Sequence, residues 1–384
     1  MIKFAVRRNL IYPLQLLLWN FLRDTESSLI SYFFNLNDLL IYTPLMFFGE
    51  ILAGSILYRY QKKFLSENKK EEKIFFMNIE YIQTEIHFKE KLDKKAFFLL
   101  FVSAFFDFVY FVLFLQVSKY ITLSGSFEQR LRGTITIINA LFYFYALGLP
   151  LFKHNLFALI CIGICVIIVI ITELIFQEFN IFLSYGQFFL ILFFIFIIHL
   201  SSALEESIEK YLFECNQLNS FFVLMFQGVF GFILTVIYCL FHSPFDDIIK
   251  FKQNSSTLNF VILIFALILY IILSGGKNSF RLLTTKIFSP MTTTFLDYIL
   301  NPFYIIYYFI SRNDFISYGK INVAYFVINV ILSLIITFCG CIYNEFLILF
   351  CCGLERDTHN QVTTRSRIEH ELDSLLSEDD PDIE

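Results

Sequence analysis

The stretch Ser124–Gly133, which reads SGSFEQRLRG, carries two arginines and a glutamine into a segment otherwise apolar enough to lie in a bilayer. A charged side chain at mid-bilayer depth costs about 3 kcal/mol on insertion scales, so such residues normally face a cavity or a partner and mark a substrate path. Gln129, Arg130 and Arg132 are therefore the first candidates for a solute-binding site. On one helix Arg130 points nearly opposite to Arg132, and the alternative for each arginine is a side chain that snorkels to the membrane surface.

The composition indicates a membrane protein. Of 384 residues, 57% are hydrophobic and 16% are charged, and the mean hydropathy is +0.66, which is far more apolar than an average soluble domain. The lipid bilayer is thus a partner, whereas a net charge of −5 gives no basic excess for nucleic acid.

The chemistry of catalysis and metal binding is not visible in the sequence. The eight cysteines lie mostly in apolar runs, without a CxxC pair or a histidine cluster, so we expect no metal and no cofactor. The motifs of serine hydrolases, zinc proteases and nucleotide-binding loops do not occur either, which argues against an enzyme.

A spanning helix needs about 20 mostly apolar residues. The apolar runs predict helices near 9–22, 38–60, 96–117, 120–146, 154–176, 185–208, 217–241, 257–276, 287–311 and 320–350. The first is doubtful as a span, because Arg23 and Asp24 follow a short apolar run.

The helices divide at Gln177–Ser184 into two groups of five. We therefore predict a first repeat over 1–176 with a polar loop at 61–95, a second repeat over 185–350, and a disordered acidic tail over 353–384.

The loop 61–95 sets the orientation. It contains nine lysines, and the positive-inside rule therefore makes it cytosolic. Counting spans from there places Lys277, Arg281 and Lys286 in a cytosolic loop and both termini in the cytosol. Termini on one side require an even number of spans, which favours ten.

The fourth and ninth predicted helices are the most polar of their halves. The ninth adds Thr293, Asp297 and Asn301 to the substrate-binding candidates. Polar segments in corresponding positions of two halves are typical of inverted-repeat transporters, whose site lies at the repeat interface. We expect Arg132 and Asp297 to lie close together there.

Four further carboxylates lie in or beside apolar runs. Glu50 and Asp107 are each near the middle of a predicted helix, and a carboxylate in apolar surroundings holds a proton more readily than in water, which suits proton coupling. The alternative is a salt bridge with one of the arginines. Glu205 and Glu206 are candidates for a gate, or else belong to a solvated helix end.

Five motifs in order resemble the drug/metabolite transporter superfamily (EamA-type), and within it the F subgroup of the nucleotide-sugar-transporter-like solute carrier 35 proteins. They are PLMFFGE at Pro44–Glu50, SGSFEQRLRGTITII from Ser124, Glu205-Glu206, FQGVFGF at Phe226–Phe232 and TKIFSPMTTTFLD at Thr285–Asp297. The resemblance covers roughly residues 40–350. It implies an all-α polytopic membrane protein with ten transmembrane helices in two inverted five-helix repeats, and both termini cytosolic. The first helix lacks the small-residue-rich pattern of the family.

The expected function is secondary-active transport of a small organic solute by alternating access. The solute could be a nucleotide sugar, a nucleotide-like anion, an amino acid or another metabolite, and arginine in the cavity favours an anion because guanidinium matches carboxylate and phosphate. Protons become a second partner if the carboxylates couple transport. The alternatives are a non-transporting scaffold or receptor with the transporter fold, and an ion channel.

The tail contains Glu371 followed by Leu375-Leu376. This spacing resembles an acidic dileucine signal, which sorting adaptors recognise. We therefore predict residence in an endomembrane: lysosome, endosome or Golgi.

Overall fold

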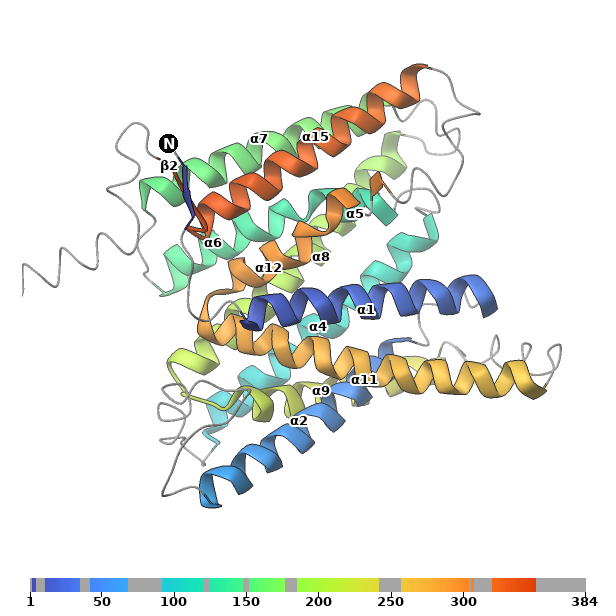
Figure 1. Ribbon diagram of the computed structural model, residues 1–384, viewed down its shortest axis with the longest axis vertical. Helices are drawn as coiled ribbons and strands as arrows, with labels where there is room; N and C mark the ends of the chain where they lie inside the picture. Colours follow the sequence, from blue (N-terminus) through green and yellow to red (C-terminus); the bar gives the residue numbers. More distant parts are fainter. Residues whose placement is uncertain are drawn as a thin grey trace, which may run out of the picture.

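The chain folds into a helical bundle with one short strand pair (Figure 1). The computed structural model describes residues 2–4, 11–34, 42–67, 92–120, 125–147, 152–176, 185–241, 257–303, 305–306 and 320–349. The sorting motif at Glu371, Leu375 and Leu376, most of the loop 61–95 and the side chain of Gln129 lie outside the described parts.

Helices occupy the predicted positions. In chain order they are α1 (Ile11–Phe34), α2 (Tyr42–Glu67), α4 (Lys94–Tyr120), α5 (Gly125–Leu131), α6 (Gly133–Leu147), α7 (Lys153–Phe176), α8 (Tyr185–Glu214), α9 (Ser220–Phe241), α11 (Thr257–Ile287), α12 (Pro290–Ile299) and α15 (Lys320–Tyr343). Strands β1 (Ile2–Phe4) and β2 (Leu347–Leu349) pair antiparallel.

Six of the described helices, α4, α7, α8, α9, α11 and α15, are long and apolar enough to cross a bilayer. The pattern along α7 shows why: its inner face is buried, while a row of isoleucines on its outer face is exposed. The exposed residues are Ile160, Ile164, Ile167, Ile171 and Ile175. A continuous apolar face of this kind is stable in lipid and not in water. The protein is therefore a polytopic membrane protein.

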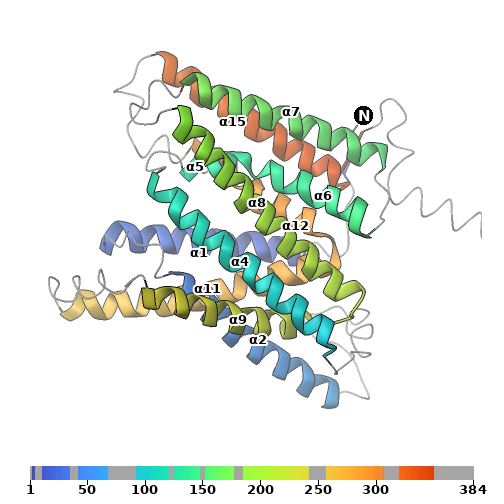
Figure 2. The ribbon, with the colours of Figure 1, turned by 180° about the vertical axis from the view of Figure 1, so that it is seen from behind.

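The helices run in similar directions across the molecule (Figure 1). Helices α7 and α15 lie side by side at one end of the long axis, and α2 lies at the other end against α9 and α11. Between them α1 packs on α11, and α4 packs on α8, as the view from behind shows (Figure 2). Helix α6 contacts α7, α8 and α12.

Several predicted boundaries are wrong. The predicted helix 120–146 is two helices, α5 and α6, while α2 continues to Glu67 and α15 ends at Tyr343. Helix α1 continues to Phe34, so Arg23 and Asp24 lie within it. Helix α8 continues to Glu214, and α11 continues to Ile287. Lys277, Arg281 and Lys286 are therefore not loop residues as predicted but belong to α11, where Arg281 has buried carboxylate partners.

Glycines allow α2 to approach its neighbours closely. A β-carbon added at Gly228 of α9 would lie 2.9 Å from the Phe47 carbonyl oxygen, the Ile51 amide nitrogen and the Glu50 Cβ, all on α2. Non-bonded carbons normally stay about 3.5–4.0 Å apart, so only glycine fits here. The close approach holds Glu50 against α9.

Candidate functional site

Charged side chains from several helices meet in the middle of the bundle. We call the first group the central charged cluster; its members are Arg23 and Asp24 of α1, Glu128 of α5, Arg132 between α5 and α6, Lys277 of α11 and Asp297 of α12. Lys277 lies within electrostatic range of Arg23, Asp24, Arg132 and Asp297. Three cations thus stand among three carboxylates.

Arg132 is the best-anchored member of the central charged cluster. Its Nε donates to Glu128 Oε1 at 3.0 Å, and its Nη2 donates to the Tyr110 hydroxyl of α4 at 3.2 Å. Glu128 is also 3.6 Å from Nε2 of His199. A buried carboxylate therefore holds the arginine in place, while the arginine keeps 23% of its side chain accessible.

The ends of short helices position these side chains. Residue Arg132 occupies the turn at which α5 ends and α6 begins, and its carbonyl oxygen accepts from the Ile135 amide at 2.9 Å. Helix α12 begins at Pro290, a residue that suits the first helical turn. Ser289 precedes it as the N-cap, and its Oγ accepts from the Thr292 amide at 3.2 Å. Interrupted helices thus bring Arg132 and Asp297 to the same region.

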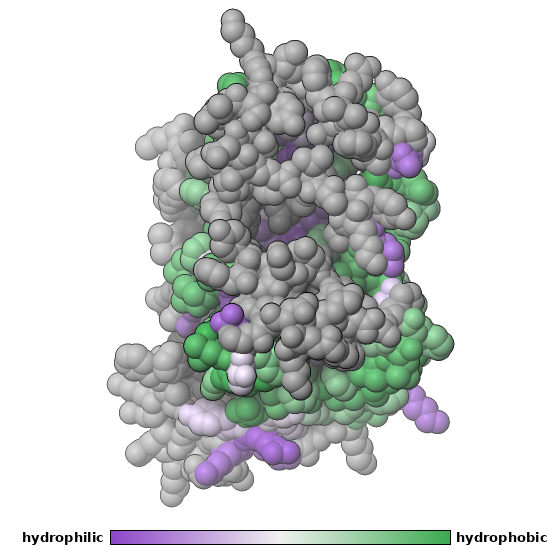
Figure 3. Space-filling model, turned by 90° about the vertical axis from the view of Figure 1, so that its right-hand side faces the viewer, coloured by the Kyte–Doolittle hydropathy of each residue, from purple (hydrophilic) through white to green (hydrophobic). Residues whose placement is uncertain are grey.

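On α1, Arg23 Nη2 donates to Asp24 Oδ1 at 2.6 Å, and Asn20 Nδ2 donates to Asp297 Oδ1 at 2.5 Å. Arg23 and Asp24 keep 20% and 35% of their side chains accessible. Lys277 is also partly exposed and forms no hydrogen bond or ion pair with any residue the structure describes. These charged side chains lie among helices and are partly accessible, and Figure 3 shows hydrophilic surface recessed near the middle of the face that it views.

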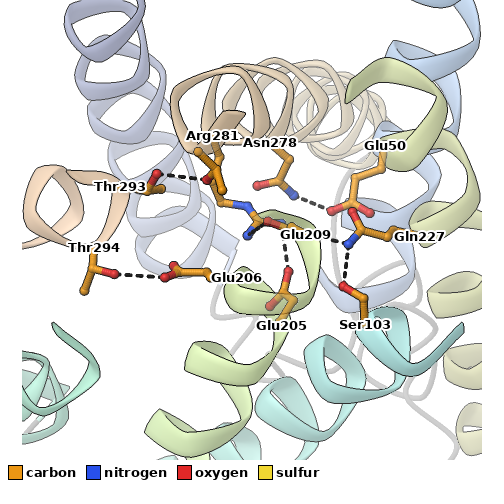
Figure 4. Close-up of polar contacts among 11 residues, drawn as sticks. Glu50, Ser103, Glu205, Glu206, Glu209, Gln227, Asn278, Arg281, Thr293 and Thr294 are labelled. Carbon is orange, nitrogen blue, oxygen red and sulfur yellow. Dashed lines mark hydrogen bonds and ion pairs between the residues drawn. The ribbon is translucent and has the colours of Figure 1, made fainter. Parts of the chain in front are cut away.

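A second group lies around Arg281 of α11 (Figure 4). We call it the acidic cluster; its carboxylates are Glu50 of α2, Asp107 of α4, and Glu205, Glu206 and Glu209 of α8. Each of these residues is buried, with at most 9% exposed. Arg281 Nη2 donates to Glu205 Oε1 at 2.7 Å and to Glu209 Oε1 at 2.8 Å, while its Nη1 donates to Glu209 Oε2 at 3.2 Å.

Amides and hydroxyls complete the acidic cluster (Figure 4). Gln227 Nε2 donates to Ser103 Oγ at 2.6 Å and to Glu209 Oε1 at 2.9 Å, and Asn278 Nδ2 donates to Glu50 Oε1. Glu206 Oε2 accepts from Asn139 Nδ2 at 2.6 Å and from Thr294 Oγ1 at 3.0 Å.

The burial and contacts of the carboxylates exclude two of the alternatives given by the sequence. Glu205 and Glu206 are each 5% exposed, so the interpretation as a solvated helix end is wrong. Neither Glu50 nor Asp107 forms an ion pair with a residue in the described ranges. The alternative interpretation, a salt bridge between these carboxylates and Arg130 or Arg132, is therefore wrong.

The structure separates the candidate arginines. Arg130 Nη1 donates to the Tyr325 hydroxyl at 2.8 Å and to Asn329 Oδ1 at 2.7 Å, and Nη2 pairs with Glu173 Oε2 at 3.1 Å. These contacts join α5 to α7 and α15, whereas Arg132 contacts Glu128 and Tyr110. Because these partners are side chains of α7 and α15, we interpret Arg130 as a structural link between helices.

The remaining candidates are also distributed. Thr293 Oγ1 lies 3.0 Å from Thr285 Oγ1, between α12 and α11, and Asn301 interacts with Tyr298. Arg132 and Asp297 both belong to the central charged cluster and lie within electrostatic range of each other, but no ion pair joins them. Their direct partners, however, are Glu128 and Asn20.

Sequence reasoning missed several members of both clusters: Arg23, Asp24, Glu128, Glu209, Gln227, Lys277 and Arg281. A signal existed for some of them, because Glu128 precedes Arg132 by four residues and Glu209 follows Glu205 by four, the spacing of neighbours on one helix face. Among the described residues no group of three or more His, Cys, Asp or Glu is arranged to hold a metal ion.

Comparison with known proteins adds no assignment. No protein-family model matches the chain, and no curated protein matches it.

Proposed function

We propose that the protein is a secondary-active transporter of a small organic solute, and that the solute binds at the central charged cluster. The observation that carries this proposal is the accessibility of Arg23, Asp24 and Arg132 inside the bundle. Charges are expensive at membrane depth and are retained where they face a cavity or a substrate path. A membrane protein that needed only stability would not keep hydrated charges between its helices.

The pairing of helices supports the resemblance to drug/metabolite transporters, and with it ten spans in two inverted repeats. If α1, α2, α4, α5–α6 and α7 correspond in order to α8, α9, α11, α12 and α15, then the contact of α1 with α11 corresponds to that of α8 with α4. Likewise, α2 on α11 corresponds to α9 on α4, and the pairs α2–α9, α6–α12 and α7–α15 map onto themselves. Such a pattern is expected of a two-fold axis between repeats.

The charges of the site favour a solute with an anionic group. Arg132 and Arg23 are neutralised by the adjacent carboxylates Glu128 and Asp24. Lys277 has no direct partner among the described residues, so its ammonium is available to a carboxylate or phosphate. The neighbouring carboxylates also allow the solute to carry a cationic group.

The pairing of β1 with β2 supports termini on one side of the membrane, because it holds the N-terminal strand beside the segment that follows α15. An even number of spans meets this condition. We propose in addition that both termini are cytosolic. We also propose that the protein resides in an endomembrane and that sorting adaptors bind its tail.

Purified protein in liposomes tests the function. Labelled nucleotide sugars, nucleoside monophosphates and amino acids are offered as a mixture, and saturable uptake is expected. Lys277→Gln should abolish uptake while leaving thermal unfolding nearly unchanged, whereas Lys94→Gln, at an exposed position on α4, is the matched control. Binding without uptake would support the scaffold or receptor alternative, and currents without saturation would support a channel.

A further inference from the structure

We propose that the acidic cluster is a proton-binding site with Glu50 as its exchangeable member, and that its proton moves together with the solute. The binding of protons does not depend on the proposed function; the coupling does. The acidic cluster has an excess of negative charge that protons would neutralise. In addition, Glu50 Oε2 and Gln227 Oε1 are buried oxygen atoms without a hydrogen-bond partner among the described residues.

The acidic cluster contains more carboxylates than cations. Of the surrounding cations, Arg281 contacts Glu205 and Glu209 directly, and Lys277 lies within electrostatic range of Asp107. Five carboxylates therefore share two cations. A buried charge without compensation costs several kcal/mol, and a carboxylic acid in that position takes up a proton instead. Protons are thus required to neutralise the cluster.

Four of the described helices carry the polar groups that surround Glu50. Helix α4 contributes Asp107, α8 contributes Glu205, Glu206 and Glu209, α9 contributes the uncharged Gln227, and α11 contributes Lys277, Asn278 and Arg281. Asp107 and Arg281 act on Glu50 most strongly among these charged groups. Because Arg281 is already occupied by Glu205 and Glu209, no cation in the described part of the chain contacts Glu50 directly.

The hydrogen-bonding pattern identifies where the proton sits. Oε1 of Glu50 accepts from Asn278, but Oε2 is buried without a partner in the described structure. On the facing helix, Gln227 must direct its amide nitrogen at the Glu209 carboxylate, since only the NH₂ group can donate. Its Oε1 is then a buried acceptor that also lacks a described partner. The two residues are 1% and 3% exposed.

A proton on Glu50 Oε2 supplies the missing donor. The protonated acid donates from Oε2, and we assign as its acceptor Gln227 Oε1, a buried oxygen on the adjacent helix that lacks a described partner; both residues are drawn in Figure 4. Without the proton, both oxygens are acceptors, and they remain buried without a donor. The close approach that Gly228 allows keeps Glu50 beside Gln227.

Lys277 connects the acidic cluster to the solute. It interacts with Asp107 on one side and with Asp24 and Asp297 on the other. When Glu50 and Asp107 are ionised, their charge attracts Lys277 away from the central charged cluster. When they are protonated, its ammonium is free to bind an anionic group. Proton and anion therefore favour each other's binding, and such coupling is reciprocal. The expected mode is symport.

Infrared difference spectroscopy on the protein in lipid nanodiscs tests the proton site. Between acidic and alkaline buffer, the carbonyl stretch of a buried protonated carboxylic acid should appear in the wild type and lose a component in Glu50→Gln. Glu214→Gln is the control, because Glu214 is 46% exposed and pairs with Lys210 on the same helix. An unchanged band in a folded Glu50→Gln protein overturns the proposal.

A second variant gives an independent measurement. Gln227→Met removes the acceptor for the protonated acid, so the band should titrate at lower pH than in the wild type. A midpoint that stays the same, or moves to higher pH, contradicts the assignment of the proton to Glu50 Oε2. This variant keeps Glu50 and is readable even if Glu50→Gln does not fold.

Coupling is measured in liposomes with the mixture of labelled solutes described above. An inward proton gradient should accelerate uptake by the wild type, whereas Glu50→Gln should carry solute at a rate independent of the gradient. Wild-type uptake that ignores the gradient refutes the coupling. The absence of any uptake refutes the proposed function instead, and leaves the infrared result to decide on the proton site.

Discussion

Replacing Gly228 by alanine should separate two helices that carry the acidic cluster. The added methyl carbon would stand 2.9 Å from a carbonyl oxygen, an amide nitrogen and a Cβ of α2. Two of these atoms belong to the backbone and cannot rotate away, so α2 and α9 must move apart by roughly 0.5–1 Å, a gap that forfeits a quarter to a half of the dispersion energy of each affected contact. Overpacking of this kind costs about 1–3 kcal/mol.

The same substitution at Gly163 of α7 is the matched control. A methyl group there meets one atom within 4 Å, the flexible Cδ1 of Ile137 at 3.8 Å. Without a clash, alanine should stabilise the helix by about 0.5–1 kcal/mol, because glycine loses more backbone freedom on folding. The two variants are therefore expected to change stability in opposite directions.

Equilibrium unfolding in mixed micelles, followed by the fluorescence of the single tryptophan, measures both effects. Trp19 stacks on Phe280 of α11 with ring centroids 6.3 Å apart, so its emission reports on the α1–α11 interface. The Gly228 variant should in addition weaken the infrared band assigned to Glu50. If Gly228→Ala stabilised the protein as Gly163→Ala does, the close packing of α2 on α9 would be refuted.

Arg130→Leu should destabilise the protein by about 3–5 kcal/mol in the same assay, since it leaves Glu173 buried without its cation. A loss of transport at full stability would instead indicate that Arg130 binds the solute. Arg132→Gln should abolish solute uptake with a smaller loss of stability, which a combined flux and unfolding measurement checks. Ser289→Ala removes the cap of α12 and should cost about 1 kcal/mol; an unchanged unfolding midpoint would mean that the cap adds nothing.

The approximate positions of the helices followed from the sequence because a transmembrane helix requires a long apolar segment. An apolar run as long as 154–176 almost always forms such a helix. The environment of the charged residues could not be predicted from the sequence. Lys277 and Arg281 resemble loop residues when only their neighbours in sequence are considered. Their environment is decided by carboxylates such as Glu205, which is 76 residues away from Arg281.

The candidate site was predictable to a similar extent. The prediction that Arg132 and Asp297 lie in one charged region rests on the correspondence of two polar helices, and both residues belong to the central charged cluster. The direct partner of Arg132 was missed although Glu128 stands only four residues before it. The acidic cluster contains residues from α2, α4, α8, α9 and α11. These helices are far apart in the sequence, so no local sequence pattern predicts that the residues meet.

The strand pair has a consequence for the order of assembly during synthesis. Ile2, in β1, is made before the described helices, and its register partner Leu349 is made after α15. The strands can therefore pair only when α15 is complete, and the entropy of closing so long a loop grows only slowly with its length. A disulfide engineered between positions 3 and 348, which face each other in the register, would then mark finished molecules and leave stalled or truncated chains unlinked.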